Sequence, residues 1–113
     1  MVHEYSLFNH GTHQISEHFK VQEFAQKDYQ CDRVLIDSEL VEVLENIRTH
    51  FKNPVIITSG YRTPEYNEKI GGVKNSQHTK GMAADIKMKM VQAKEVQKYL
   101  SQKYPDKYGI GLS

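Results

Sequence analysis

The sequence has little cysteine, since Cys31 is the only one in 113 residues. A single thiol excludes a disulfide within a monomer, and it also excludes a zinc site built from clustered cysteines. We interpret Cys31 as a structural or incidental thiol, because free cysteine usually packs like a small apolar residue. A metal site in this chain would therefore need other ligands.

An excess of charge of one sign is also lacking. The chain has 15 lysines and arginines against 14 aspartates and glutamates, for a net charge of +1. Apolar residues interrupt the lysine-rich stretch Lys87–Lys98, which predicts the solvated face of a helix. Mixed charges of this kind leave no electrostatic footprint for nucleic acid, so we expect no nucleic-acid partner.

Long hydrophobic runs are absent as well. No segment approaches the about 20 apolar residues that span a membrane, and residues 1–5 lack the basic start and apolar core of a secretory signal. The sequence therefore predicts a protein that is made in the cytoplasm and has no membrane partner. With 38% hydrophobic and 26% charged residues, positions 1–113 predict one soluble domain, which we expect to be monomeric.

The apolar pattern predicts segregated helices and a few strands, which is typical of an α+β fold with helices packed on a small, mainly antiparallel sheet. Residues 1–15 are polar and have no apolar period, so they predict an arm. Asp37 offers an N-cap to a long helix, and Val21–Lys27 predicts a short one. The apolar residues of the long helix fall on one stripe, namely Leu40, Val43, Leu44, Ile47 and Phe51.

Flanking proline and glycine residues, together with periodicity, predict the remaining elements. They are a strand at Val55–Thr58, a helix capped by Thr63 and opened by Pro64, a helix from about Val91 to Pro105, and a last strand at Tyr108–Leu112. Because the first of these strands is continuously β-branched, we expect it to be covered on both faces.

His78 and Asp85 are candidate metal ligands, seven positions apart. Zinc binds histidine nitrogen and aspartate oxygen at about 2.0 to 2.2 Å, so two ligands of one ion lie roughly 3 to 3.5 Å apart. A straight strand at about 3.3 Å per residue would separate these two residues by roughly 23 Å. The chain therefore has to fold back between them, and Gly81, which tolerates positive φ, is the place for that bend.

Each candidate ligand also has an ordinary alternative. An isolated His78 would most often be a surface or hydrogen-bonded histidine, and Asp85 could simply end the strand predicted at Met82–Ile86. A carboxylate in that apolar run, however, needs a cation or hydrogen-bond donors to offset its desolvation. Zinc would supply the cation.

The same residues carry a family resemblance. The pattern Ser76-x-His78-x-x-Gly81-x-Ala83-x-Asp85 resembles the SxHxxGxAxD signature of the M15 zinc peptidases, the group of D-Ala-D-Ala carboxypeptidases and phage endolysins that cut peptidoglycan peptides. The block Val55–Asn67 is similar to the strand, SGYR turn and helix that precede this signature in the family. Similarity at Ile15–Phe24 and Leu35–Val41 extends the resemblance over nearly the whole chain.

The resemblance implies a zinc-dependent peptidase that acts on peptidoglycan stem peptides and has a hedgehog/DD-peptidase-like fold. It implies that His78 and Asp85 bind Zn²⁺, which polarises the scissile carbonyl and activates a water. By the same resemblance Arg62 anchors the substrate, and its planar fork suits a carboxylate or a developing oxyanion. The alternative for Arg62 is a structural ion pair with Glu65 or Asp85.

Three neighbouring residues are candidates for substrate binding. Ser76 and Gln77 could hydrogen-bond the backbone of a substrate, or they could only shape the loop that carries His78. Tyr61 is the third candidate, and its alternative is packing in the core.

One departure from the family pattern lies at the C-terminal end. Family members continue, after a strand like Tyr108–Leu112, to a second zinc-binding histidine and to acidic residues, one of which is the general base. This sequence stops at Ser113 and so supplies two ligands, whereas a catalytic zinc normally has three. We expect either a truncated chain or a degenerate relative, and we expect the 113-residue form to be inactive. The last strand should lie beside Met82–Ile86, because only then could a continuing chain reach the site.

Two further hypotheses follow from this departure. His10 and His13 could replace the third ligand, although Gly11 and the lack of an apolar period favour a solvated arm. The chain could also be a non-catalytic binding or structural module that keeps the metal scaffold. If its target is the cell wall, either another agent has to release it, for example during phage lysis from a phage or prophage gene, or the leader is missing because of cloning.

Overall fold

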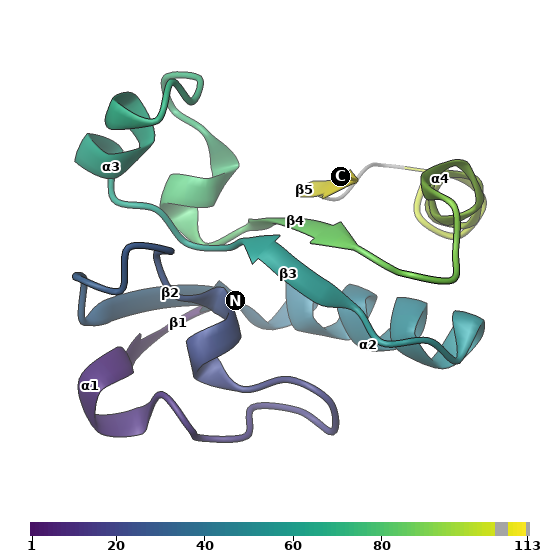
Figure 1. The fold of residues 1–113 in the computed structure, drawn as a ribbon, viewed down its shortest axis with the longest axis horizontal. Helices are drawn as coiled ribbons and strands as arrows, with labels where there is room; N and C mark the ends of the chain where they lie inside the picture. The colour runs from purple at the N-terminus through teal and green to yellow at the C-terminus, as the bar shows by residue number, and fades with distance from the viewer. Residues whose placement is uncertain (106–108, 113) are drawn as a thin grey trace.

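The computed structural model describes residues 1–105 and 109–112, which form an α+β fold as predicted (Figure 1). The strands in these ranges form two sheets. β1 (Val2–Ser6) pairs antiparallel with β2 (Arg33–Asp37), and the second sheet has the order β3 (Ile56–Ser59), β4 (Ala83–Lys87), β5 (Gly109–Leu112). β3 and β4 are antiparallel, whereas β4 and β5 are parallel. β5 thus lies beside β4, the strand that carries Asp85, as predicted. Tyr108, the first residue of the predicted last strand, lies outside the described residues.

The longest helix, α2 (Ser38–Phe51), begins at the predicted cap. The Asp37 side chain accepts a hydrogen bond from the backbone N–H of Glu39 at 3.3 Å. Its buried stripe is Leu40, Val43, Leu44 and Ile47, which pack in the core with residues of the three-stranded sheet. Figure 1 shows α2 running along one side of that sheet, so the predicted stripe is the face that joins helix and sheet.

The shorter helices also follow local signals. In α3 (Pro64–Lys69) the Thr63 hydroxyl accepts a hydrogen bond from the backbone N–H of Tyr66 at 3.1 Å. α4 (Ala93–Lys103) buries Val96 in the core. The helix predicted from Val21 is a single 3-10 turn, η1 (Val21–Phe24). No helix within the described ranges is long and apolar enough to cross a membrane.

Successive residues of the three-stranded sheet point to opposite sides. Ile57, Ala84 and Ile86 belong to the buried core, so Asp85 lies on the other side of β4. The prediction that β3 is covered on both faces is wrong, because Ile56 is 38% exposed. An antiparallel pair can bury one face alone, which leaves the other face of this sheet available for a site.

Residues 1–15 do not form the predicted arm. They include β1, which pairs with β2 along its length, and a helical turn, α1 (Leu7–His10). The carboxylate of Asp32 accepts hydrogen bonds from the Ser6 hydroxyl at 2.7 Å and from the backbone N–H of Phe8 at 2.8 Å. These bonds, the first above all, lower the pKa of Asp32. Contacts with residues distant in sequence therefore order a segment that has no apolar period of its own.

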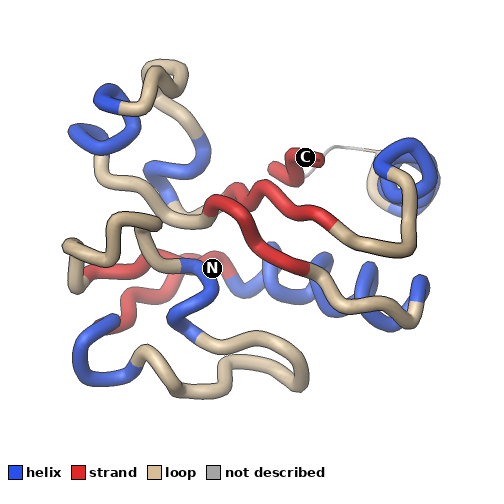
Figure 2. Tube along the Cα trace, viewed as in Figure 1, coloured by secondary structure: helices blue, strands red, loops and turns tan. Residues whose placement is uncertain are grey.

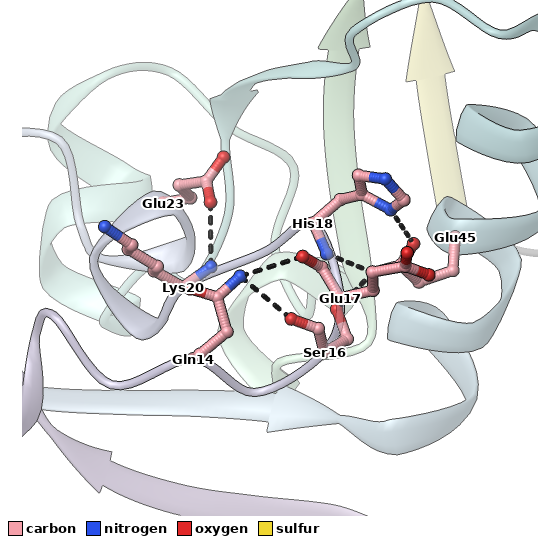
Figure 3. A network of polar contacts seen from close by, with 7 residues as sticks. All are labelled: Gln14, Ser16, Glu17, His18, Lys20, Glu23 and Glu45. Atoms are coloured by element: carbon pink, nitrogen blue, oxygen red, sulfur yellow. Dashed lines mark hydrogen bonds and ion pairs between the residues drawn. The ribbon is translucent and has the colours of Figure 1, made fainter.

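Loops join the elements of the N-terminal half (Figure 2), and a polar network fixes one of them onto α2 (Figure 3). Glu45 accepts hydrogen bonds from the Ser16 hydroxyl at 2.5 Å and from the backbone N–H of His18 at 2.7 Å, and His18 Nδ1 lies 2.6 Å from its other oxygen. Burial raises the pKa of Glu45, but the hydrogen bonds from Ser16 and His18 together outweigh it and leave the pKa below its ordinary value. The network therefore stabilises the fold while Glu45 is ionised.

Glu45→Gln is expected to lower the free energy of unfolding by about 1–3 kcal/mol at pH 7, because hydrogen bonds to a charged acceptor are lost. Since the pKa of Glu45 is lowered in the folded protein, its contribution is present above the unfolded pKa and is lost as pH falls through the folded value. Denaturant unfolding at several pH values would measure this. Glu17→Gln, at an exposed position of the same loop, is the control and should change little. Equal stability of both variants at pH 7 would contradict the prediction.

Candidate metal centre

The loop before β4 places His78 on the side of the sheet that carries Asp85. His78 lies in a 3-10 turn, η2 (Gln77–Lys80), where its backbone N–H donates to the Ser76 hydroxyl at 3.2 Å. Gly81 ends the turn with φ 74°, a left-handed conformation that glycine adopts without strain. A Cβ on Gly81 would also lie 2.5 Å from the carbonyl oxygen of Leu35. The chain therefore folds back at Gly81, as predicted.

The fold-back brings the two candidate ligands together. His78 Nε2 lies 3.4 Å from Asp85 Oδ1, and the two side chains are 12% and 34% exposed. This distance agrees with the roughly 3 to 3.5 Å expected between two ligands of one zinc ion. Their role as ligands stays a prediction, but the geometry it requires is present.

A backbone carbonyl fixes the orientation of the His78 ring. His78 Nδ1 lies 2.8 Å from the carbonyl oxygen of Gly60, and because a carbonyl only accepts, Nδ1 carries the hydrogen. In the neutral imidazole the lone pair is then on Nε2, the nitrogen that faces Asp85. Metal-ligating histidines commonly donate their other ring N–H in this way. Sequence reasoning missed the Gly60 carbonyl. The available signal was the glycine itself, because a glycine directly after β3 marks a turn. Only glycine fits there, since a Cβ at Gly60 would lie 2.5 Å from the carbonyl oxygen of Phe24.

Gly111 of β5 leaves room for the carboxylate of Asp85. The two residues are paired in the parallel register of β4 and β5, and a Cβ on Gly111 would lie 2.1 Å from Asp85 Oδ1. Any other residue here would displace the carboxylate or the strand. The donor set of one imidazole nitrogen and one carboxylate, the latter accommodated against Gly111, thus fits a zinc ion.

Arg62 extends the site from the end of β3. Its backbone N–H donates to the carbonyl oxygen of His78 at 3.1 Å, and its side chain is 14% exposed. Nε donates to the Ser59 hydroxyl at 3.1 Å and Nη1 donates to Asn67 Oδ1 at 3.0 Å. Nη2 lies 3.6 Å from Asp85 Oδ2. Of the two ion pairs considered for Arg62, the pair with Asp85 is therefore present, and it places the guanidinium beside the candidate ligands.

The three predicted substrate-binding residues differ in exposure. Ser76 is 7% exposed and its hydroxyl caps η2, which supports the alternative that it shapes the loop. Gln77 is exposed, and its carbonyl accepts the backbone N–H of Met82 at 3.1 Å. Tyr61 is 4% exposed and belongs to the core, where burial raises its pKa. This burial supports packing as the role of Tyr61.

The hypothesis that His10 or His13 supplies a third ligand does not agree with the structure. His10 ends α1, and the ring of His13 lies 6.4 Å from the ring of Tyr5 in β1. Among residues 1–105 and 109–112, no three histidine, cysteine, aspartate or glutamate residues form a group that could hold a metal. In the described part of the chain, His78 and Asp85 therefore have no third candidate ligand of these types beside them.

Comparison with known families identifies the chain. The family model described as Peptidase M15 matches residues 17–113, so the protein belongs to the M15 peptidase family, as predicted. The matched region contains Arg62, His78 and Asp85. No curated protein and no solved structure matches the chain.

Proposed function

We propose that the protein is a zinc-dependent peptidase that acts on peptidoglycan stem peptides. The observation that carries the proposal is the 3.4 Å distance between His78 Nε2 and Asp85 Oδ1, with the His78 ring fixed by the Gly60 carbonyl. His78 and Asp85 would hold the ion. Zinc, when bound, polarises the scissile carbonyl and activates a water. We propose in addition that the protein is made in the cytoplasm and reaches the cell wall through another agent, such as phage lysis.

The residues around the ion would orient the substrate. Arg62 offers a planar cation beside Asp85, and its fork binds a peptide carboxylate or the oxygen on which negative charge develops. The Gly60 carbonyl keeps the His78 Nε2 lone pair directed at the site through the hydrogen bond to Nδ1. Gly111, which has no side chain, leaves the room that the Asp85 carboxylate occupies.

Zinc titration by calorimetry tests the metal part of the proposal. We expect weak binding to the 113-residue chain, because two protein ligands fix the ion less well than the usual three. His78→Ala should weaken this binding by more than about tenfold. Loss of a residue that only hydrogen-bonds to a metal ligand already lowers metal affinity by about this factor, and the loss of a ligand itself should lower it further. His13→Ala is the control and should leave the affinity unchanged. Tight stoichiometric binding that His10→Ala or His13→Ala abolishes would show that the N-terminal segment supplies a ligand.

A non-catalytic module of the same fold is the second candidate function. The observation in its favour is that the described residues offer two ligands, one of which also pairs with Arg62. A form extended by native downstream sequence distinguishes the two functions, because only the peptidase should then hydrolyse peptidoglycan with zinc. The 113-residue chain itself is expected to give no hydrolysis under either function. Chelator-sensitive hydrolysis that is lost in His78→Ala would instead show that the chain already holds a third ligand and a base.

A further inference from the structure

Asn67 is a buried polar residue in α3 that is connected to Arg62. It is 3% exposed, and both polar atoms of its side chain have partners: Oδ1 accepts from Arg62 Nη1 at 3.0 Å and Nδ2 donates to the carbonyl oxygen of Val73 at 2.8 Å. A buried amide with both ends satisfied is held in one orientation. Asn67 therefore links helix α3, the loop at Val73 and the guanidinium of Arg62.

The loop after α3 is shaped around this side chain. Gly72 donates its backbone N–H to the carbonyl oxygen of Asn67 at 2.8 Å. A Cβ on Gly72 would lie 2.1 Å from Asn67 Oδ1 and 3.1 Å from Arg62 Nη1. Glycine at this position thus permits the contact between Asn67 and Arg62.

Ser59 completes the support of the guanidinium from the other direction, because its hydroxyl accepts from Arg62 Nε at 3.1 Å. A planar group fixed at Nε and Nη1 has no remaining freedom to turn about its long axis. Its third nitrogen, Nη2, is then the one directed at Asp85, 3.6 Å away.

We propose that Asn67 is a positioning residue that fixes the guanidinium of Arg62 so that Nη2 faces the candidate metal centre. Amide chemistry suits this role, because Asn67 Oδ1 accepts a hydrogen bond without neutralising the cation. A carboxylate at the same place would pair with Arg62 and weaken its attraction for a negatively charged substrate group. The anchoring of substrate rests on the proposed function, whereas the positioning of Arg62 does not.

NMR of the arginine side chains tests the positioning directly. The arginines of this chain are Arg33, Arg48 and Arg62. We expect separate Nη signals for Arg62 in the wild-type protein, because rotation about the Cζ–N bonds is restrained. Arg33 is the internal control: its side chain is 56% exposed and should give averaged signals. Asn67→Ala should make the Arg62 signals averaged too, while Asn67→Asp, which keeps an acceptor, should leave them separate.

Backbone amide spectra show whether each variant is folded. If Asn67→Ala does not fold, Asn67→Ser replaces it, because serine keeps a hydroxyl but is too short to reach Nη1. Restrained Arg62 signals in a folded Asn67→Ala or Asn67→Ser protein would overturn the proposal, as would averaged signals in the wild-type protein.

Titration of the zinc-loaded protein with the dipeptide D-alanyl-D-alanine tests the consequence for substrate. We expect Asn67→Ala to weaken binding by up to about a hundredfold, because small misplacements of an anchoring group have effects of this size. In the Arg62→Lys background the same change should have little further effect, since residues that act through one another are not additive. Additive losses would overturn the positioning role. Absence of dipeptide binding to the wild-type protein would overturn D-alanyl-D-alanine as the part of the substrate that Arg62 anchors, and the NMR result would still decide the positioning.

Discussion

Arg62→Lys is expected to lower peptide turnover by about 10²–10³-fold, a loss typical of removing one donor that stabilises developing charge. Lysine carries a point charge, so it cannot donate to Ser59 and Asn67 and still present a planar edge beside Asp85. The free energy of unfolding should fall by about 1–3 kcal/mol, because the change removes hydrogen bonds and leaves the buried Asn67 Oδ1 without its donor. Because no hydrolysis is expected of the 113-residue form, kcat/KM is measured in a form extended by native downstream sequence. Denaturant unfolding of the same form measures the change in stability.

Arg33→Lys is the matched control for this prediction. Arg33 pairs with Glu4 at 3.0 Å on the surface, where the two side chains are 56% and 64% exposed. Exposed pairs of this kind contribute little, so neither turnover nor stability should change measurably. If Arg62→Lys kept full turnover, the ion pair with Asp85 would be the role of Arg62, and the substrate would have to be held by other residues.

The helices were predictable because their signals are local. Asp37 and Thr63 cap helices within the next three residues, and the apolar stripe of α2 lies within one continuous segment.

The two-stranded sheet was not predictable, because the contacts that hold it are not local in the sequence. β1 is polar and largely exposed, and it is held by backbone pairing with Arg33–Asp37 and by the hydrogen bond from the Ser6 hydroxyl to Asp32. None of these partners is near it in the sequence.

The side chains of the candidate site were predictable from the sequence, whereas the backbone and glycine positions that hold them in place were not. His78 and Asp85 stand out by residue type and spacing, and Arg62 stands out by the family resemblance. The Gly60 carbonyl belongs to the backbone, and Gly111 acts through the side chain it lacks, so neither leaves a chemical signal in the sequence. For Gly111, the available signal is the alternation of glycine with apolar residues in β5, which places small residues on the side of Asp85.

Gly111→Ala is expected to abolish zinc binding at His78 and Asp85. The added Cβ would lie 2.1 Å from Asp85 Oδ1, so either the carboxylate turns away from His78 or β5 moves away from β4. Overpacking of this kind also destabilises a protein, by about 1–3 kcal/mol. Calorimetric zinc titration and denaturant unfolding would measure the two effects on the same variant.

Gly109→Ala separates these effects, because Gly109 lies two positions earlier on the same side of β5. Its added Cβ would lie 2.7 Å from the carbonyl oxygen of Met82 and 2.9 Å from the Cβ of Ala83, away from the carboxylate of Asp85. We therefore expect Gly109→Ala to lower the stability and to keep the zinc affinity. Gly111→Ala should lower the stability and abolish zinc binding. Equal losses of affinity would mean that the spacing of β4 and β5 governs the site. Unchanged affinity in Gly111→Ala would mean that Asp85 does not bind the ion, because its carboxylate cannot hold the same position beside an alanine.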